Sequence, residues 1–154
     1  MTIRIIRIII ILFFCFTTCY ASSEQFDNWK YDIKFIKKGC IYPVGEFSYE
    51  LKSPMSVLVN YSLITVPEGF VTDLATIPRA FWSFDSPFDG KYMSSAILHD
   101  YLYSCSLVHS RKEADRILYS GMISEGSSKW TANKFYFAVR LFGGGHYDGN
   151  KKCQ

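Results

Sequence analysis

The sequence predicts an α+β fold, with a small antiparallel sheet in the N-terminal half followed by about three packed helices. Short runs in the first half alternate apolar and polar residues, whereas the second half repeats apolar residues at helical spacing. The chain has 154 residues, of which 49% are hydrophobic and 20% charged, and these values indicate one packed domain. They exclude a disordered chain, and the lack of repeats excludes collagen-like and coiled-coil classes.

The first 21 residues are predicted to be a secretory signal peptide. Arg4 and Arg7 precede the apolar run Ile8–Phe16, and a short stretch of small and polar residues leads to Ala21. This run is shorter than the roughly twenty residues that a membrane span needs. We therefore expect cleavage after Ala21 and a periplasmic or secreted protein, with lipidation of Cys19 as the alternative. Cleavage would lower the net charge from +3 to +1, which argues against a nucleic-acid partner.

We expect residues 22–30 to form a flexible start and residues 31–154 to form a single globular domain without a transmembrane helix. Its first half contains segments of alternating or β-branched residues, which favour three to five short antiparallel strands. The segments are Tyr31–Ile36, Phe47–Lys52, Val57–Val59 and Leu63–Val66.

The second half is predicted to be helical. Ser110 and Glu113 have the spacing of a capping box, which marks the start of a helix. Three consecutive glycines, residues 143–145, are expected to end the last helix. The predicted helices are Tyr92–Ser104, Arg111 to about Ile123, and Ser128 or Lys129 to Val139 or Leu141.

Three cysteines remain after the predicted signal peptide, namely Cys40, Cys105 and Cys153. In an oxidising compartment, this odd number predicts one disulfide and one free or intermolecular thiol. Cys153 could pair with Cys40 or with Cys105, and the sequence does not choose between them. No pair has the CxxC spacing of a zinc or thioredoxin-like site.

The predicted helix that contains His99 carries the densest group of polar residues in an apolar context. His99 and Tyr103 are four residues apart, so they share one helix face. Asp115 lies on the next helix, and antiparallel pairing would bring it beside His99. Such a His–Asp pair could act as a general base that activates water. The alternative is a hydrogen-bonded core histidine with a structural role.

A loop that follows a predicted strand ending at Phe70-Val71 is a second candidate. Asp73 and Thr76 are residue types that hold loops through side-chain-to-backbone bonds, but they could also bind a ligand. Asp73 could hold a metal ion together with Asp100. Trp82 belongs to an aromatic group that could form an acyl-binding or membrane-touching rim, although such residues are more often buried. The group is Phe81, Trp82, Phe84 and Phe88.

The segment after the last helix is the third candidate. Its glycines could form an anion-binding nest, and His146 could join His99 in a metal site. The two histidines lack the spacing of known zinc motifs, so the pattern is weak.

Three ordered motifs resemble one protein family. They are Val66–Pro78, Ala96–Tyr103 and Ser110–Asp115, and the resemblance extends over about Tyr31–Tyr147. This family is the phage- and bacteria-associated domain of unknown function 1353. The resemblance implies a small domain that is often found in phage genomes, without a settled reaction.

His99-Asp100-x-x-Tyr103 also resembles the His-Asp-x-x-Tyr helix of secreted phospholipase A2. The resemblance implies that His99 is the general base, Asp100 a calcium ligand and Asp115 the acid that orients the histidine. Tyr103 would be a supporting hydrogen-bond donor. The glycine-rich calcium loop and the paired cysteines of those enzymes are missing here, so Asp73 would have to supply a ligand.

These patterns lead to three hypotheses. The first is an exported hydrolase that uses His99 and Asp115 to activate water and acts on envelope lipid or peptidoglycan, with a divalent cation such as Ca²⁺ at Asp100 and Asp73. The second is a non-enzymatic, phage-derived envelope protein that binds a partner in exclusion or immunity. The third is a zinc-dependent cell-wall peptidase that uses His99, His146 and an acid.

Overall fold

The computed structural model describes residues 30–74, 92–105, 107–108, 110–148, 151 and 153. Residues 31–154 form one compact unit. The predicted signal peptide, Thr76 and the aromatic rim with Trp82 lie outside the described residues. Among those that are described, no helix is long and apolar enough to cross a membrane.

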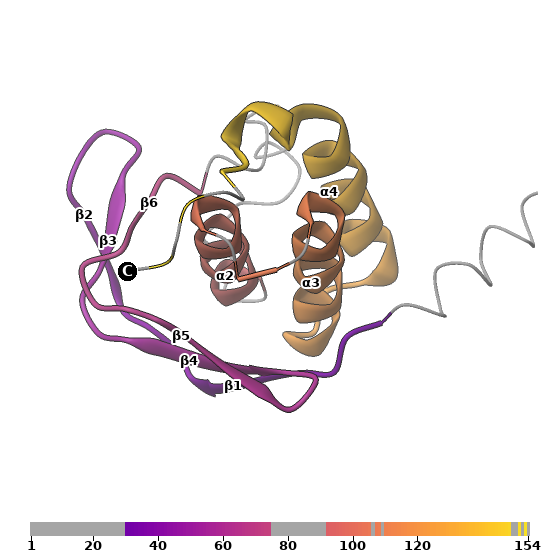
Figure 1. Cartoon of the computed structure of the whole chain (residues 1–154), viewed down its shortest axis with the longest axis horizontal. Coiled ribbons are helices and arrows are strands. Elements are labelled where there is room, and N and C mark those ends of the chain that lie inside the picture. Colours follow the sequence, from indigo (N-terminus) through magenta and orange to yellow (C-terminus); the bar gives the residue numbers. More distant parts are fainter. Residues whose placement is uncertain are drawn as a thin grey trace, which may run out of the picture. The chain divides into compact units, whose positions relative to one another are not determined.

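The predicted α+β class is confirmed, and the described strands divide into two small antiparallel sheets. In the first sheet, β4 (Met55–Val59) lies between β1 (Ile33–Lys37) and β5 (Ser62–Val66). Alternate residues of β4 are buried, as expected for a strand that packs on one face. Figure 1 shows the helices on one side of this sheet.

The turn between β4 and β5 has a conformation that fixes the hairpin. Asn60 and Tyr61 have φ angles of 46° and 67°, typical of the type I′ turn that joins two antiparallel strands. The backbone N–H of Asp32 donates to the Asn60 side chain at 2.8 Å, and the Asn60 N–H donates back to the Asp32 carbonyl at 2.9 Å. The turn is therefore tied to the entry of β1.

The second sheet has β3 (Tyr49–Leu51) between β2 (Ile41–Pro43) and β6 (Val71–Thr72). Strand β2 was not predicted, because it is short and ends at a proline, which is unfavourable inside a sheet. Strand β6 is only two residues long, and it contacts α2. It thereby places Thr72 against the helix that carries His99.

Three helices and a short 3₁₀ helix follow among the described residues. They are α2 (Met93–Ser104), α3 (Arg111–Ser124), α4 (Lys129–Phe142) and η2 (Gly143–His146). The three predicted helices are confirmed almost to the residue. Ser110 and Ser128 cap α3 and α4, each accepting a hydrogen bond from a backbone N–H three residues on.

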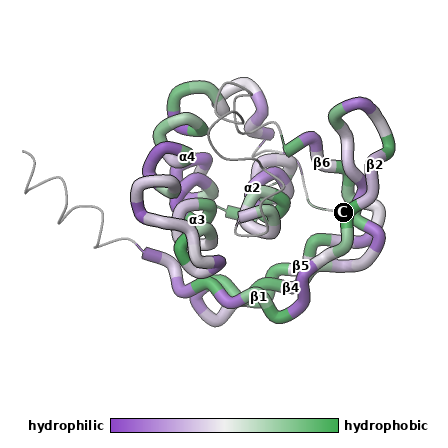
Figure 2. The backbone as a smooth tube through the Cα atoms, turned by 180° about the vertical axis from the view of Figure 1, so that it is seen from behind, coloured by the Kyte–Doolittle hydropathy of each residue, from purple (hydrophilic) through white to green (hydrophobic). Residues whose placement is uncertain are grey.

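Hydrophobic residues follow the strands of the first sheet and part of each helix (Figure 2). The buried core includes Leu51 from β3 and, from the three described helices, Leu98, Leu118 and Phe135. Cys105 and Cys153 form a disulfide that ties the C-terminal segment to the end of α2. Of the two pairings that the sequence left open, this is the one observed. Cys40 is exposed and is a free cysteine.

Candidate functional site: a buried histidine–aspartate pair

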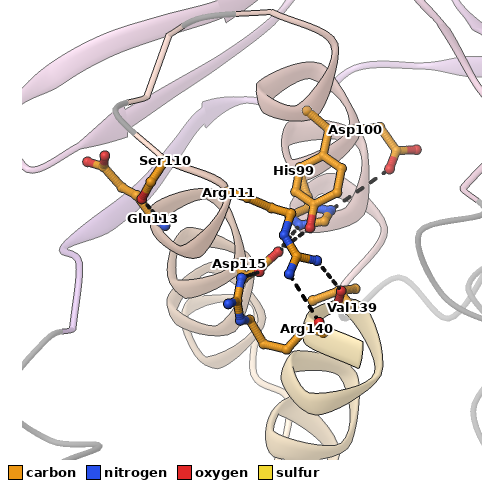
Figure 3. A network of polar contacts seen from close by, with 9 residues as sticks. His99, Asp100, Ser110, Arg111, Glu113, Asp115, Val139 and Arg140 are labelled. Atoms are coloured by element: carbon orange, nitrogen blue, oxygen red, sulfur yellow. Dashed lines mark hydrogen bonds and ion pairs between the residues drawn. The ribbon is translucent and has the colours of Figure 1, made fainter. Parts of the chain in front are cut away.

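Helices α2 and α3 bring together the two residues that the sequence paired. His99 Nε2 lies 2.9 Å from Asp115 Oδ1, and neither side chain has any exposed surface. The two helices pack against each other along their length, and both residues face their shared interface (Figure 3). Apolar neighbours such as Leu98, Leu102 and Leu118 are also buried, so the polar pair lies inside the hydrophobic core.

Two further groups hold the Asp115 carboxylate. The Tyr103 hydroxyl donates to Oδ1 at 2.5 Å, and the Tyr103 ring lies against the His99 ring with their centroids 4.1 Å apart. The Arg140 guanidinium, from α4, donates to Oδ2 at 2.8 Å. Asp115 therefore joins all three helices through charge-assisted hydrogen bonds, which are stronger than neutral ones.

The charges of the pair follow from its surroundings. Burial alone would raise the pKa of Asp115, but hydrogen bonds from His99, Arg140 and Tyr103 together lower it. Burial lowers the pKa of His99, and the hydrogen bond to Asp115 opposes this effect only in part. At neutral pH, a neutral imidazole thus faces an ionised carboxylate.

This charge state assigns the tautomer of His99. An ionised carboxylate only accepts hydrogen bonds, so the ring proton must lie on Nε2, and Nδ1 keeps an unshared electron pair. Nδ1 is buried and has no hydrogen-bond partner among the described residues. The nearest carboxylate oxygen to it, Asp100 Oδ1, is 4.0 Å away, which is too long for a hydrogen bond.

Asp100, the next residue of α2, lies in a different environment. The Thr72 hydroxyl, from β6, donates a hydrogen bond to its Oδ2. Burial raises the pKa of Asp100 to about 7, and the nearby negative charge of Asp73 contributes in the same direction. Asp100 therefore changes its charge near neutral pH.

A cavity of about 330 Å³ opens beside Asp100. Asp73, Tyr103 and His146 also line it, while His99 lies behind them and has no surface in the cavity. The structure thus brings Asp73 close to Asp100, as the metal-site prediction required. The other predicted binding residues, Thr76 and Trp82, lie outside the described part of the chain.

The acidic and histidine side chains of the described residues do not by themselves form a metal site. Within this part of the chain, no three His, Cys, Asp or Glu side chains come close enough together to hold one. Calcium takes six to eight oxygen ligands, and Asp100 with Asp73 supplies only two carboxylates. His99 and His146 likewise belong to no such group of three within the described residues.

Sequence reasoning missed the two arginines of this site. Arg140 is the partner of Asp115, and the Arg111 guanidinium donates to the carbonyls of Val139 and Arg140, both at 3.2 Å. Figure 3 shows both arginines around the buried carboxylate. One signal was available in the sequence. The α4 segment contains no acidic residue, so a carboxylate partner for Arg140 had to come from another element.

Comparisons with known proteins agree with these motifs. The family model described as protein of unknown function (DUF1353) matches residues 49–139, which include Thr72, His99 and Asp115. Uncharacterized protein y4jT of Sinorhizobium fredii is 35% identical over 79 residues, which cover 51% of this chain and 23% of that protein. Uncharacterized protein y4iH of the same organism is 34% identical over 85 residues, covering 53% and 35%.

The chain thus spans only about a quarter to a third of these two relatives, so they share one segment with it. No solved structure matches the chain. The family match covers more than half of the sequence and contains the strand β6, the His-Asp helix and the following aspartate. The chain belongs to the DUF1353 family of proteins of unknown function.

Proposed function

We propose that this domain is an exported hydrolase in which His99 acts as a general base on water. The observation that carries the proposal is the state of the His99 ring. Asp115 binds Nε2, and the unshared electron pair on Nδ1 accepts no hydrogen bond from any described residue. A neutral imidazole held in one tautomer by a buried carboxylate is suited to accept a proton.

The proposed step is the hydrolysis of an ester or amide. Nδ1 of His99 takes a proton from water while the water oxygen bonds to the carbonyl carbon of the substrate. The imidazolium then gives that proton to the leaving oxygen or nitrogen as its bond to carbon breaks. Asp115 stabilises the imidazolium through Nε2, and Tyr103 and Arg140 keep the Asp115 carboxylate ionised and in place.

The cavity beside Asp100 is the proposed substrate site, and water would have to reach Nδ1 of His99 from it past Asp100, because His99 itself has no surface there. Asp100 and Tyr103 flank His99 on α2, and both line this cavity. The arrangement supports the likeness to the His-Asp-x-x-Tyr helix of secreted phospholipase A2, including the tyrosine that donates to the orienting acid. With the predicted signal peptide, the accessible substrates would be envelope lipid or peptidoglycan.

The test is hydrolysis by the purified protein of phospholipid vesicles and of peptidoglycan, measured as released fatty acid or muropeptide. We expect His99→Gln to lower the rate by at least about a hundredfold, the usual size of a general-base contribution. The exposed residue Asp32 provides a matched control, and Asp32→Asn should keep the wild-type rate. A wild-type protein that is folded but inactive on both substrates would contradict the proposal.

The pH profile separates catalysis from folding. Because burial lowers the pKa of His99 below its ordinary value of 6.5, His99 stays neutral in slightly acidic solution. Activity should therefore persist at pH 6 and fall only at lower pH, while circular dichroism shows an intact fold. An activity that is already half lost at pH 6.5 would show that another group is the base.

A second candidate is a non-enzymatic envelope protein that binds a partner, as in phage exclusion or immunity. The observation in its favour is that His99 has no exposed surface and lies behind the residues that line the cavity. In this case His99, Asp115 and Arg140 form a structural network. His99→Gln would then lower the stability without changing any hydrolysis, because the wild type would have none.

A further inference from the structure

Helix α4 exposes large apolar side chains along its outer face. Trp130, Phe137 and Leu141 are separated by seven and four residues, a spacing that places them on one side of the helix. Trp130 is 74% exposed and Leu141 75% exposed, and Phe137 and Phe142 are also more than half exposed. From Trp130 to Leu141 this stripe extends about 16 Å at ~1.5 Å per residue.

The opposite side of α4 is already used by the fold. Ala132, Phe135 and Val139 are buried in the core, and Arg140 binds Asp115. Trp130 and Leu141 therefore contribute little to the packing that holds α4 in place, whereas the Phe137 ring also contacts Tyr136 edge-on. Single exposed apolar residues are ordinary on a protein surface, but an aligned row that contains a tryptophan usually marks a binding surface.

The charge of α4 indicates what binds there. Apart from Arg140, which is paired with Asp115, the helix contains Lys129 and Lys134 and has no Asp or Glu along its length. An exposed row of Trp, Phe and Leu accompanied by lysines is the composition of a helix that lies in the surface of an anionic membrane. Tryptophan is suited to this place, because its ring is apolar and its N–H is polar.

We propose that the outer face of α4 docks onto an anionic phospholipid bilayer, with Trp130, Phe137 and Leu141 inserted between the lipids. A second copy of this chain fits less well. A twofold axis at the middle of the stripe would bring Lys134 against the same lysine of the other copy. An anionic bilayer instead offers negative charge to Lys129 and Lys134 and an apolar layer to the stripe.

The docking face continues toward the cavity. Leu141 and Phe142 are followed directly by η2, whose His146 lines the cavity beside Asp100. Gly143 packs so closely on Tyr103 that an added Cβ atom would lie 3.0 Å from its hydroxyl oxygen. A docked α4 therefore keeps the cavity near the lipid surface, and the docking itself does not require hydrolysis.

The test is sedimentation of the full chain with vesicles that contain phosphatidylglycerol, compared with vesicles of pure phosphatidylcholine. We expect binding to the anionic vesicles, much weaker binding to the neutral ones, and weaker binding at high salt. The double variant Trp130→Ser/Leu141→Ser should bind at least about tenfold more weakly, because two large apolar side chains no longer leave water. Both residues are exposed, so folding should be unaffected.

The matched control removes two exposed side chains from the hairpin of β4 and β5. Tyr61 is 91% exposed and Leu63 is 63% exposed, and the double variant Tyr61→Ser/Leu63→Ser should bind like the wild type. All variants keep the same apolar N-terminal segment, so its contribution to vesicle binding is equal in each. His99→Gln should also bind fully, which separates this proposal from the proposed hydrolysis.

Three results would overturn the docking proposal. One is equal binding of the α4 double variant and the wild type, and another is a wild type that does not bind anionic vesicles. The third is a wild-type dimer in light scattering that becomes a monomer in Trp130→Ser/Leu141→Ser. That result would assign the stripe to a second copy of the chain.

Discussion

Helix α2 places two neighbouring residues, His99 and Asp100, in two contrasting environments. On the His99 side, the carboxylate of Asp115 is fully buried, binds Arg140, and has a lowered pKa. One residue further on, the carboxyl group of Asp100 lies at a cavity, accepts a hydrogen bond from the Thr72 hydroxyl, and has a pKa raised to about 7. Both carboxyl groups are desolvated, yet their pKa values move in opposite directions.

The difference shows how the surrounding donors decide the charge of a buried acid. Asp115 has a guanidinium, an imidazole N–H and a phenol, which together outweigh the cost of its burial. Around Asp100 the burial effect dominates, and the nearby Asp73 adds to it. Asp115 is thus suited to hold a fixed charge, while Asp100 is suited to gain or lose a proton at the cavity.

The largest expected effect comes from removing the fixed charge. Asp115→Asn removes the fully buried carboxylate that accepts from His99, Tyr103 and Arg140, and we expect a loss of roughly 3–5 kcal/mol in the free energy of unfolding. Urea unfolding at pH 7 measures it. Asp32→Asn, an exposed change of the same chemistry, should stay within about 0.5 kcal/mol of the wild type. Similar small losses in both variants would show that the ion pair does not stabilise the fold.

The second prediction concerns Asp100, whose folded-state pKa is raised. The folded protein then binds more protons than the unfolded chain between about pH 4 and pH 7, so this group makes stability fall as the pH rises through that window. Asp100→Asn removes this effect, and above pH 7 it should stabilise the protein by up to about 4 kcal/mol.

Urea unfolding of Asp100→Asn and the wild type at pH 5 and pH 8 measures this effect. The advantage of the variant should be clearly larger at pH 8. Parallel pH profiles for the two proteins would mean that Asp100 titrates in its ordinary range. The contrast between a raised pKa of Asp100 and a lowered pKa of Asp115 would then not hold.

The third prediction is that Arg140 holds the pKa of Asp115 down. Arg140→Gln should cost roughly 2 kcal/mol at pH 7, the usual value of a hydrogen bond to a charged group. A lowered pKa contributes stability above the unfolded value near 4, and this contribution is lost as the pH falls. Wild type and variant should therefore converge as the pH falls below that unfolded value and through the lowered pKa of Asp115. Arg140→Lys keeps the charge, so it should recover part of the loss at pH 7.

The helices and the His99–Asp115 pair were predictable from the sequence, because the signals for them are local. The i, i+4 spacing of His99 and Tyr103 and the cap at Ser110 fix the helix faces and the start of α3, and a short connection makes the helices antiparallel. Asp115 therefore falls beside His99. The pairing of Cys105 with Cys153 was left open, because two partners were equally compatible with the spacing.

The parts that were not predictable depend on long-range packing. Arg140 reaches Asp115 across 25 positions of sequence, and no local pattern on α4 specifies that distance. Strand β2 is only three residues long and ends at Pro43, so it has no periodicity of its own and forms only because β3 lies beside it. The contact of Thr72 with Asp100 likewise depends on where β6 packs.

The smallest expected effect concerns Tyr103, which belongs to both sides of the comparison because it donates to Asp115 and also lines the cavity. Tyr103→Phe keeps the ring against His99 and removes only the hydroxyl, so we expect a loss of about 1.5 kcal/mol in urea unfolding. Tyr101→Phe, on the same helix, is the matched control, since the Tyr101 ring packs edge-on against Phe70. Equal losses would assign the role of Tyr103 to ring packing alone. A loss confined to Tyr103→Phe, together with a higher acid-unfolding midpoint, would show that its hydroxyl helps to keep Asp115 ionised.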